Sequence, residues 1–257
     1  MITLLNGEHW AKEEILAQMY EDDFYYNKLG KHALSSSSLK MILKSPKTYR
    51  NVTKYGDPNS DSPALAAGKL AHWMILEPHK IDELYFVNAS TKNTKIYKEA
   101  KEQHGEVFLA KEKAAAERLT DAVLRNEAAL QLLSNSEFEV PEIAMLEEGL
   151  AFRGKADIIQ GDTIIDYKTT GAELSLFRYS AEKYGYDLQA YMYLRLFNKK
   201  KFTFLVIDKA STDIGIFETT DEFIAKGKEK FDRAVSDYKY FFEEDNDLDQ
   251  YVMRGIL

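Results

Sequence analysis

The chain has no cysteine among its 257 residues. Disulfides, cysteine nucleophiles, iron–sulfur clusters and thiolate zinc sites are therefore excluded. Long apolar runs are also missing, since the run from Phe202 to Ile207 is far shorter than the roughly 20 residues that cross a bilayer. The first residues lack the basic and apolar regions of a signal peptide. We therefore expect a protein of the cytoplasm, without a membrane partner.

Positive charge is in deficit, because 34 Lys and Arg face 42 Asp and Glu, for a net charge of -8. Such a balance argues against a protein that coats nucleic acid through its global field. A polyanion would need a local basic patch, and residues 36–56 offer one on a helical pattern without a single acidic residue. Its basic residues are Lys40, Lys44, Lys47, Arg50 and Lys54. A solvated helix face explains this segment equally well.

The composition is that of an ordinary globular protein, with 45% hydrophobic residues. Helical patterns dominate the first half, and short β-like runs interleaved with helices follow it, which predicts a single domain of the α/β (α+β) class. The expected parts are an N-terminal arm (1–33), a mainly helical part (34–138), an α/β core (139–242) and a C-terminal tail (243–257). Turn-forming residues also predict a loop at 56–63.

A hairpin pattern, RGKADIIQGDTIIDYKTT, carries charged residues where a core face is expected. Two β-like runs flank Gly161 and Asp162, which suit a tight turn. Pairing outward from this turn sets Asp157 directly opposite Asp166, and like charges so placed repel each other. Lys168 projects on the same face as Asp166. The group is either a structural ion-pair cluster or a site where both carboxylates bind Mg²⁺ or Mn²⁺.

This arrangement resembles the PD-(D/E)xK nuclease superfamily, in which an acid on one strand precedes a (D/E)-x-K motif on the next. Asp157 matches the first acid, although Ala156 stands where the name-giving pattern has proline, and Asp166-Tyr167-Lys168 matches the motif. The resemblance implies a central mixed sheet flanked by helices. A chain without cysteine cannot belong to the iron–sulfur subfamilies.

Three further segments resemble the RecE-type and RecB-like exonuclease branch, and they occur in the expected order. They are the Ser-rich turn 35–38 with the Ser-Pro-x-x-Tyr segment 45–49, the G-x-x-x-H helix 68–78 with His72, and the Q-x-x-x-Y helix with Gln189 and Tyr193. Each is weak alone. A lone buried histidine is usually a core residue, and a short Gln and Tyr pattern usually marks an ordinary amphipathic helix.

The resemblance implies a metal site with His72, Asp157, Asp166, the Tyr167 carbonyl and Glu142 as ligands, Mg²⁺ as cofactor and Mn²⁺ as substitute. Glu139, three residues before Glu142, competes for the last place because the strand register is open. Lys168 would act on the attacking water or the transition state. Gln189 would hold that water or the scissile phosphate, and Tyr193 would pack against the DNA end or support Gln189. The expected DNA contacts are Ser37, Lys40, Lys44, Lys47 and Arg153.

The implied activity is 5′-to-3′ resection of linear double-stranded DNA ends, which leaves 3′ single strands for a single-strand annealing protein. The branch acts as closed rings, so a homo-oligomer, a trimer or tetramer, encoded by a phage or prophage, is expected. Three alternatives stay open. They are an endonuclease or 3′-directed enzyme on the same site, a non-catalytic DNA-binding protein on the nuclease fold, and an interaction protein whose Asp-Tyr-Lys motif is accidental.

Overall fold

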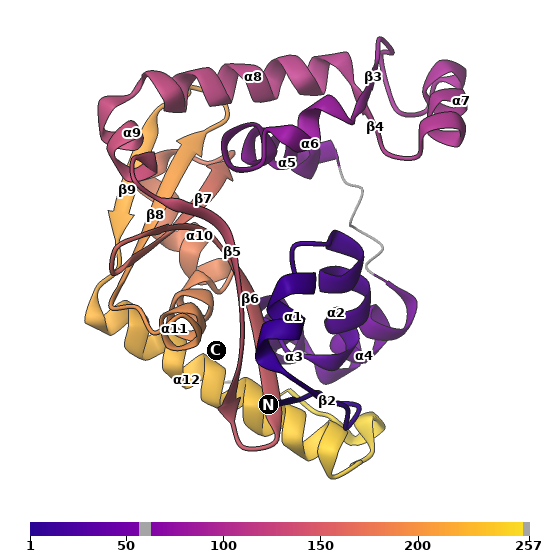
Figure 1. Cartoon of the computed structure of the whole chain (residues 1–257), viewed down its shortest axis with the longest axis vertical. Helices are drawn as coiled ribbons and strands as arrows, with labels where there is room; N and C mark the ends of the chain where they lie inside the picture. The colour runs from indigo at the N-terminus through magenta and orange to yellow at the C-terminus, as the bar shows by residue number, and fades with distance from the viewer. Residues whose placement is uncertain (57–62, 254–257) are drawn as a thin grey trace.

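The computed structural model describes residues 1–56 and 63–253, without the side chains of residues 63–65. The predicted loop at 56–63 and the last apolar residues of the tail thus lie almost wholly outside the described residues. The centre of the molecule is a five-stranded sheet in the order β5-β6-β7-β8-β9 (Figure 1). Its strands are β5 (Glu137–Glu147), β6 (Leu150–Gln160), β7 (Thr163–Thr170), β8 (Lys201–Asp208) and β9 (Ile214–Glu218). Strands β7 and β8 are parallel and the other pairs antiparallel, so the sheet is mixed.

The hairpin between β6 and β7 turns at Gly161, whose φ of 56° lies in the left-handed region that glycine adopts without strain. Three residue pairs follow the turn, ending at Ile158 opposite Ile165. The expected next pair, Asp157 opposite Asp166, is not formed. Instead the Tyr167 N–H donates to Asp157 Oδ2 at 2.8 Å, so a side chain takes over where the ladder stops. The prediction of directly opposed aspartates is therefore wrong.

One face of the sheet is covered by α5 (Pro63–Leu76), α8 (Ala110–Arg125) and α9 (Glu127–Leu133) (Figure 1). Ile165 and Leu205 pack on this side against Leu70 and Leu119, all of them fully or almost fully buried. The parallel strands have apolar residues on both faces, as strands between two helical layers require.

The opposite face is covered by α3 (Ser36–Lys44), α11 (Tyr186–Leu196) and α12 (Asp221–Tyr238) (Figure 1). Ile164 and Phe204 alternate with the residues above and pack there against Leu188 and Phe231. Helix α3 begins at the predicted serine run, where Ser35 accepts from Ser38 N–H and the Ser38 hydroxyl accepts from Ser35 N–H. Thr220 caps α12, because its hydroxyl accepts from the Phe223 N–H.

The N-terminal arm is more regular than predicted. It forms β1 (Ile2–Thr3), β2 (His9–Trp10), α1 (Lys12–Gln18), a π-helix at Asp23–Lys28 and α2 (Leu29–His32). Ile15 and Leu29 are fully buried in one cluster with Ile143 of β5 and Ala151 of β6. The arm therefore packs on the half of the sheet that α5 and α8 leave free.

Further elements connect these layers. They are α4 (Pro46–Tyr55), α6 (His79–Asp82), β3 (Tyr85–Val87), α7 (Lys95–His104), β4 (Val107–Leu109), α10 (Phe177–Lys183), the π-helix Lys239–Glu243 and short 3₁₀ turns at Leu174–Leu176 and Leu248–Gln250. The parallel pair β3 and β4 was not predicted. Helices α10 and α11 are separated by Gly185, which has a φ of 63°. No described helix is long and apolar enough for a membrane span.

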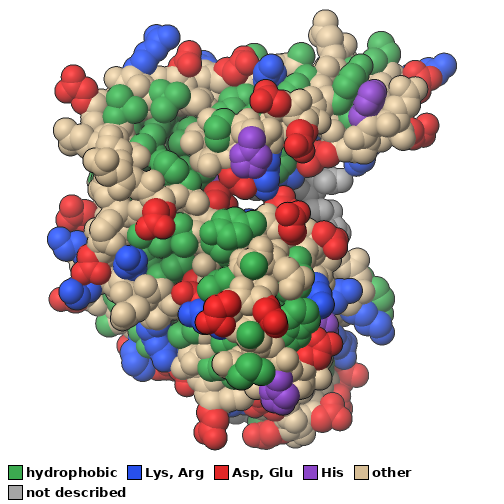
Figure 2. Space-filling view, viewed as in Figure 1, with side chains coloured by type: hydrophobic (Ala, Val, Ile, Leu, Met, Phe, Trp, Pro, Cys, Tyr) green, Lys and Arg blue, Asp and Glu red, His purple; other side chains and the backbone are tan. Residues whose placement is uncertain are grey.

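Acidic and basic side chains are interspersed over the face that Figure 2 shows, without one large basic field. The same view shows an indented outline between the part that carries α7 and α8 and the part that carries α1 to α4. The charge distribution on this face thus agrees with the acidic net charge.

Candidate active site

His72 reaches the hairpin from α5. Its Nε2 atom lies 3.5 Å from Asp157 Oδ1 and 3.4 Å from Glu139 Oε1. One turn earlier, Gly68 lets the helix approach β7, since a Cβ atom at this position would lie 2.7 Å from Thr169 Oγ1. The glycine and the histidine of the G-x-x-x-H pattern thus work together: the first permits close packing, and the second uses it to meet Asp157.

Glu139 is the second acid beside His72. It lies in β5 between the pairs Phe138–Ile158 and Val140–Ala156, and its φ of 50° is in the left-handed region. A side chain other than glycine is strained there, and such strain gathers at functional sites. Its Oε1 atom is buried and has no hydrogen-bond partner among the described residues. Burial and the charge of Asp157 raise the pKa of Glu139 to about 8.

Glu77 completes a group of three possible ligands. Single ligand atoms of His72, Glu77 and Glu139 all lie within 4.8 Å of one another. Glu77 follows α5 in the Leu-Glu-Pro ending, and one of its oxygens pairs with Lys80 Nζ at 3.0 Å. The sequence analysis gave Glu77 no role. The available signal was a carboxylate just before Pro78, which ends the helix that carries His72.

The other half of the site is centred on Asp166, which is only 2% exposed. Lys168 Nζ lies 2.6 Å from Asp166 Oδ2, and Gln189 Nε2 donates to Asp166 Oδ1 at 2.7 Å. Lys40 Nζ of α3 donates in turn to Gln189 Oε1 at 3.2 Å. Four side chains from α3, β7 and α11 therefore form one connected polar chain on the α11 face of the sheet.

The charges of these groups depend on one another. Burial alone would lower the pKa of His72, but the neighbouring Asp157 and Glu139 raise it. Burial would raise the pKa of Asp157, but His72 and the Tyr167 N–H lower it. For Asp166 burial prevails over Lys168 and raises the pKa. Burial would lower the pKa of Lys168, which Asp166 and Asp157 instead raise, so Lys168 is an ammonium at neutral pH.

A cavity of about 350 Å³ opens beside these residues. Its lining includes Lys168, His72, Tyr186, Gly68 and Thr169. The site is thus accessible from outside through a passage that carries lysine and tyrosine side chains. A substrate with phosphate groups would find both positive charge and hydrogen-bond donors there.

The family model described as "PDDEXK-like domain of unknown function (DUF3799)" matches residues 35–247, most of the chain. The chain belongs to this family. The resemblance to PD-(D/E)xK nucleases and the predicted fold class are thereby confirmed, and the mixed five-stranded sheet flanked by helices agrees with both.

Two solved structures are similar to this DUF3799 chain, and the first of them supports its fold. One is a protein provisionally named an exonuclease, from Eubacterium rectale, with a TM-score of 0.68 and 14% identity over 92% of this chain and 95% of that one. Another is a phage related exonuclease from Haemophilus somnus 129PT, with a TM-score of 0.36 and 17% identity over 83% of this chain and 96% of that one. A search of curated proteins finds no match.

Glu142, expected as a further ligand in the DUF3799 site, is bound elsewhere. One of its oxygens pairs with Lys12 Nζ at 2.8 Å and accepts from the Ile143 N–H at 2.7 Å. The acid of β5 that meets His72 is Glu139. The left-handed residue at position 139 redirects the strand locally, and no sequence pattern marks such a residue in advance. We therefore replace Glu142 by Glu139 in the proposed ligand set.

Tyr167 and Tyr193 have supporting positions. The Tyr167 backbone N–H holds Asp157, and its ring lies on the α5 side with its centroid 6.3 Å from that of His72. Tyr193 is buried, and its hydroxyl donates to the Lys155 carbonyl of β6 at 3.2 Å. Gly154 makes room for the Tyr193 ring, because a Cβ atom there would lie 3.1 Å from it. Tyr193 thus fastens α11 to β6 on the strand that carries Asp157.

The expected DNA contacts lie in different surroundings. Ser37 and Lys44 are exposed, Lys47 pairs with Asp249 of the tail at 3.2 Å, and Lys40 belongs to the polar chain around Asp166. Arg153 is buried, with its guanidinium carbon 4.3 Å from the centroid of the Tyr25 ring. This position does not fit a contact with exposed phosphate, since the N-terminal arm covers it. We therefore remove Arg153 from the proposed DNA contacts.

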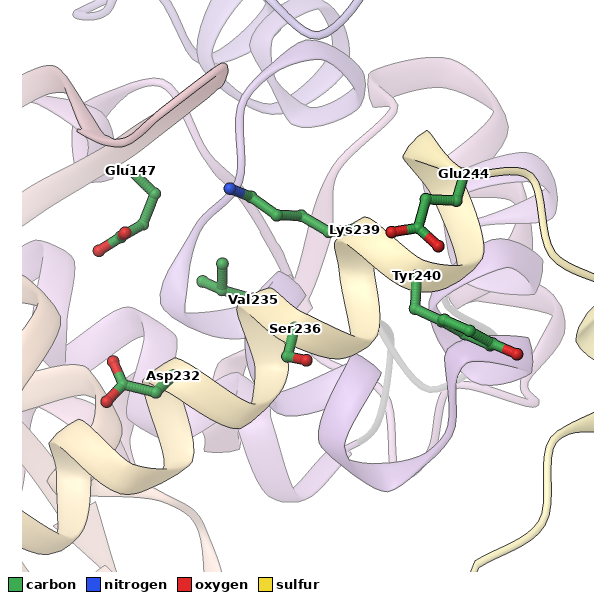
Figure 3. A pocket seen from close by; sticks show the side chains of 7 residues that line it. All are labelled: Glu147, Asp232, Val235, Ser236, Lys239, Tyr240 and Glu244. Carbon is green, nitrogen blue, oxygen red and sulfur yellow. The ribbon is translucent and has the colours of Figure 1, made fainter.

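A second hollow, of about 430 Å³, shares no residue with this site. Figure 3 shows that its side chains come from α12 and the π-helix after it, with Glu147 approaching from β5. Three of its residues are acidic and one is a lysine: Glu147, Asp232, Glu244 and Lys239. The polar chain, the metal-ligand candidates and the cavity beside them are all remote from its lining.

Proposed function

We propose that this protein is a metal-dependent DNA exonuclease. The observation that carries the proposal is the buried Oε1 atom of Glu139, which lacks a hydrogen-bond partner yet lies 3.4 Å from the His72 ring and next to Asp157. Buried acids in proteins are paired, protonated or bound to a metal ion, and here two acids share the single imidazole of His72. A divalent cation would balance this excess of acid, and the family fold supplies the nuclease context.

The residues fit Mg²⁺, with Mn²⁺ as a substitute. His72, Glu139, Asp157 and Asp166 would hold the ion, with the Tyr167 carbonyl as a further ligand and Glu77 as an additional acid. Carboxylate-rich sets suit Mg²⁺ and Mn²⁺, and one imidazole favours Mn²⁺ somewhat. When bound, such an ion polarises a phosphate and lowers the pKa of a coordinated water.

The side chains around Asp166 would prepare the reaction. Lys168, an ammonium 2.6 Å from Asp166, supplies a fixed positive charge toward the phosphoryl oxygens. Gln189 holds Asp166 from the other side, so that this carboxylate keeps one orientation. Lys40 orients the Gln189 amide by donating to its oxygen. Exposed Lys44 and Ser37, on the same helix, would contact the DNA backbone.

The finer assignment rests on the resemblance to RecE-type exonucleases. We propose degradation of linear duplex DNA from 5′ ends, with the 3′ strand left for a single-strand annealing protein in phage or prophage recombination. A ring of three or four subunits would let an acidic chain grip DNA through a local basic channel. Light scattering of the purified protein tests this assembly, and a monomeric mass at working concentration contradicts it.

The decisive experiment uses linear duplex DNA labelled at the 5′ or the 3′ end, with a closed circle as control. We expect Mg²⁺-dependent release of the 5′ label, an intact circle, and no cleavage in EDTA. Release of the 3′ label first would reverse the polarity. A cut circle would indicate an endonuclease, and binding without cleavage in Mg²⁺ and Mn²⁺ would indicate a DNA-binding protein.

A further inference from the structure

A short row of aromatic rings leads from the proposed catalytic lysine to the surface. Lys168 Nζ lies 5.4 Å from the centroid of the Tyr186 ring. The Tyr186 ring in turn lies 5.9 Å from the Tyr184 ring, at an interplanar angle of 35°. Tyr184 is 53% exposed, although it is a large aromatic residue. We call Tyr186 and Tyr184 the tyrosine pair.

Positive charge accompanies both rings. Lys40 Nζ lies 5.3 Å from the Tyr186 centroid, so this ring contacts two lysines, and Lys183 Nζ lies 5.4 Å from the Tyr184 centroid. Burial and the nearby Lys168 lower the pKa of Lys40 to about 8. Surfaces that bind single-stranded nucleic acid have this combination, in which bases stack on aromatic rings while cations track the phosphates.

The backbone around Gly185 sets the positions of the two rings. Gly185 separates the two tyrosines in a left-handed conformation, between the end of α10 and the start of α11. A Cβ atom at Gly185 would lie 3.4 Å from the Lys40 side chain, an ordinary contact distance, so the left-handed backbone and not a lack of space favours glycine here. The inner ring is anchored, because Tyr186 packs 5.6 Å from Phe204 and 6.0 Å from Phe177 between ring centroids. The outer ring, Tyr184, rests on Tyr186 and faces solvent.

We propose that the tyrosine pair is a base-stacking subsite for an unpaired DNA strand, a proposal that rests on the proposed nuclease function. A phosphate bound at Lys168 places its own nucleotide beside the Tyr186 ring, and the next base outward meets Tyr184. Bases inside a duplex are stacked on each other and cannot use these rings. The pair therefore takes the separated end of the strand that enters the site.

Photocrosslinking with 5-iodouracil tests this subsite directly, because this base couples to an aromatic side chain on which it stacks. We use single-stranded DNA with the label at one of the first three 5′ positions or ten positions inward, and a protein that carries Asp166→Ala to prevent cleavage. The expected result is a crosslink from the terminal positions to the peptide with Tyr184 or Tyr186. The inner label gives none there.

Affinity for the same strand is the second readout. Tyr184→Leu should weaken binding about tenfold and abolish the crosslink at position 184, whereas Tyr184→Phe should retain both, since it keeps the ring. Tyr240→Leu is the matched control. Tyr240 is a tyrosine of similar exposure, 50%, and it lies in the π-helix at the second hollow, which shares no residue with the candidate active site (Figure 3). It should bind like the unsubstituted protein.

The outcomes separate the two proposals. If the unsubstituted protein degrades DNA but Tyr184→Leu binds and crosslinks unchanged, the subsite is wrong and the nuclease stands. If the unsubstituted protein neither cleaves nor binds DNA, both proposals are overturned. A loss of affinity in Tyr184→Leu and Tyr240→Leu alike would also overturn the subsite, since it would reflect general damage.

Discussion

The two halves of the candidate site solve the problem of buried charge differently. Around Asp166, a single carboxylate has the Lys168 ammonium 2.6 Å from Oδ2 and a hydrogen bond from Gln189 to Oδ1, although Oδ2 has no hydrogen-bond partner among the described residues. Around His72, the carboxylates of Glu139 and Asp157 share one imidazole, and an oxygen of Glu139 has no hydrogen-bond partner. The first half pairs one carboxylate with one ammonium, while the second leaves two carboxylates to a single imidazole. This excess of acid around His72 is the physical argument for a metal ion there, which Asp166 would also help to hold.

The largest expected effect comes from removing Asp157, in the His72 half of the site, or Asp166, in the other half. Asp157→Ala and Asp166→Ala should each lower the cleavage rate at least about a thousandfold, because several kcal/mol of transition-state stabilisation depend on the ion they hold. Rates on labelled linear duplex measure this, and circular dichroism checks that the fold persists. A rate within tenfold of the unsubstituted protein would disprove the assignment.

Replacing Glu139 tests the His72 half of the site through the pH dependence of thermal stability. Since burial raises its pKa, protonation of Glu139 favours the folded state, and this contribution is lost as pH rises through about 8. In EDTA the Tm should therefore fall between pH 6 and 9 by a few degrees, and Glu139→Gln should reduce this fall. With Mg²⁺ present, the Glu139→Gln variant should also cleave DNA about a hundredfold more slowly than the original protein.

Glu142→Gln is the matched control, since it changes the same group on the same strand. Its acid pairs with Lys12, so cleavage should stay within about twofold of the original rate. Equal losses from the two substitutions would contradict the choice of Glu139 as ligand.

A smaller effect is expected where α5 meets β7. Gly68→Ala adds a Cβ atom 2.7 Å from Thr169 Oγ1, so either the Thr169 side chain or the helix must shift, and we expect the helix shift to carry His72 away from Asp157. We expect about a tenfold weaker activation by Mg²⁺, measured as the concentration for half-maximal rate. Thr169→Ala in addition should restore most of it, because the obstructing atoms are removed. Additive losses in the double variant would exclude this steric account.

The smallest effect is expected in the half of the site around Asp166. Lys40→Met removes the donor to Gln189 Oε1, so the amide loses one of its two restraints and the rate should fall a few-fold. Lys44→Met changes an exposed lysine one turn along the same helix, and it should mainly weaken DNA binding as salt rises. If the two variants behave alike in rate and salt dependence, Lys40 is a simple phosphate contact and not a positioning residue.

Much of this site was predictable because its residues are close in sequence. The turn at Gly161, the Asp157 strand and the Asp-Tyr-Lys strand follow from alternation and turn chemistry over 18 residues. The resemblance predicted Gln189 in the active site, but its hydrogen bond to Asp166 was not predicted. The choice between Glu139 and Glu142 was not predictable, because it depends on one left-handed residue in β5. The burial of Arg153 was equally hidden, since the arm that covers it lies over a hundred residues earlier.

The sequence by itself determined the local elements, the hairpin and the types of residue in the site. Periodicity and turn residues act over a few positions, so each short segment predicts its own secondary structure. Only the tertiary structure decided which acid meets His72, and that Asp157 accepts from the Tyr167 N–H in place of a strand partner. It also decided that the exposed Tyr184 contacts Tyr186, which in turn lies next to Lys168. These outcomes depend on how β5, α5, α10 and α11 pack together, and such packing is settled by contacts between segments far apart in the chain.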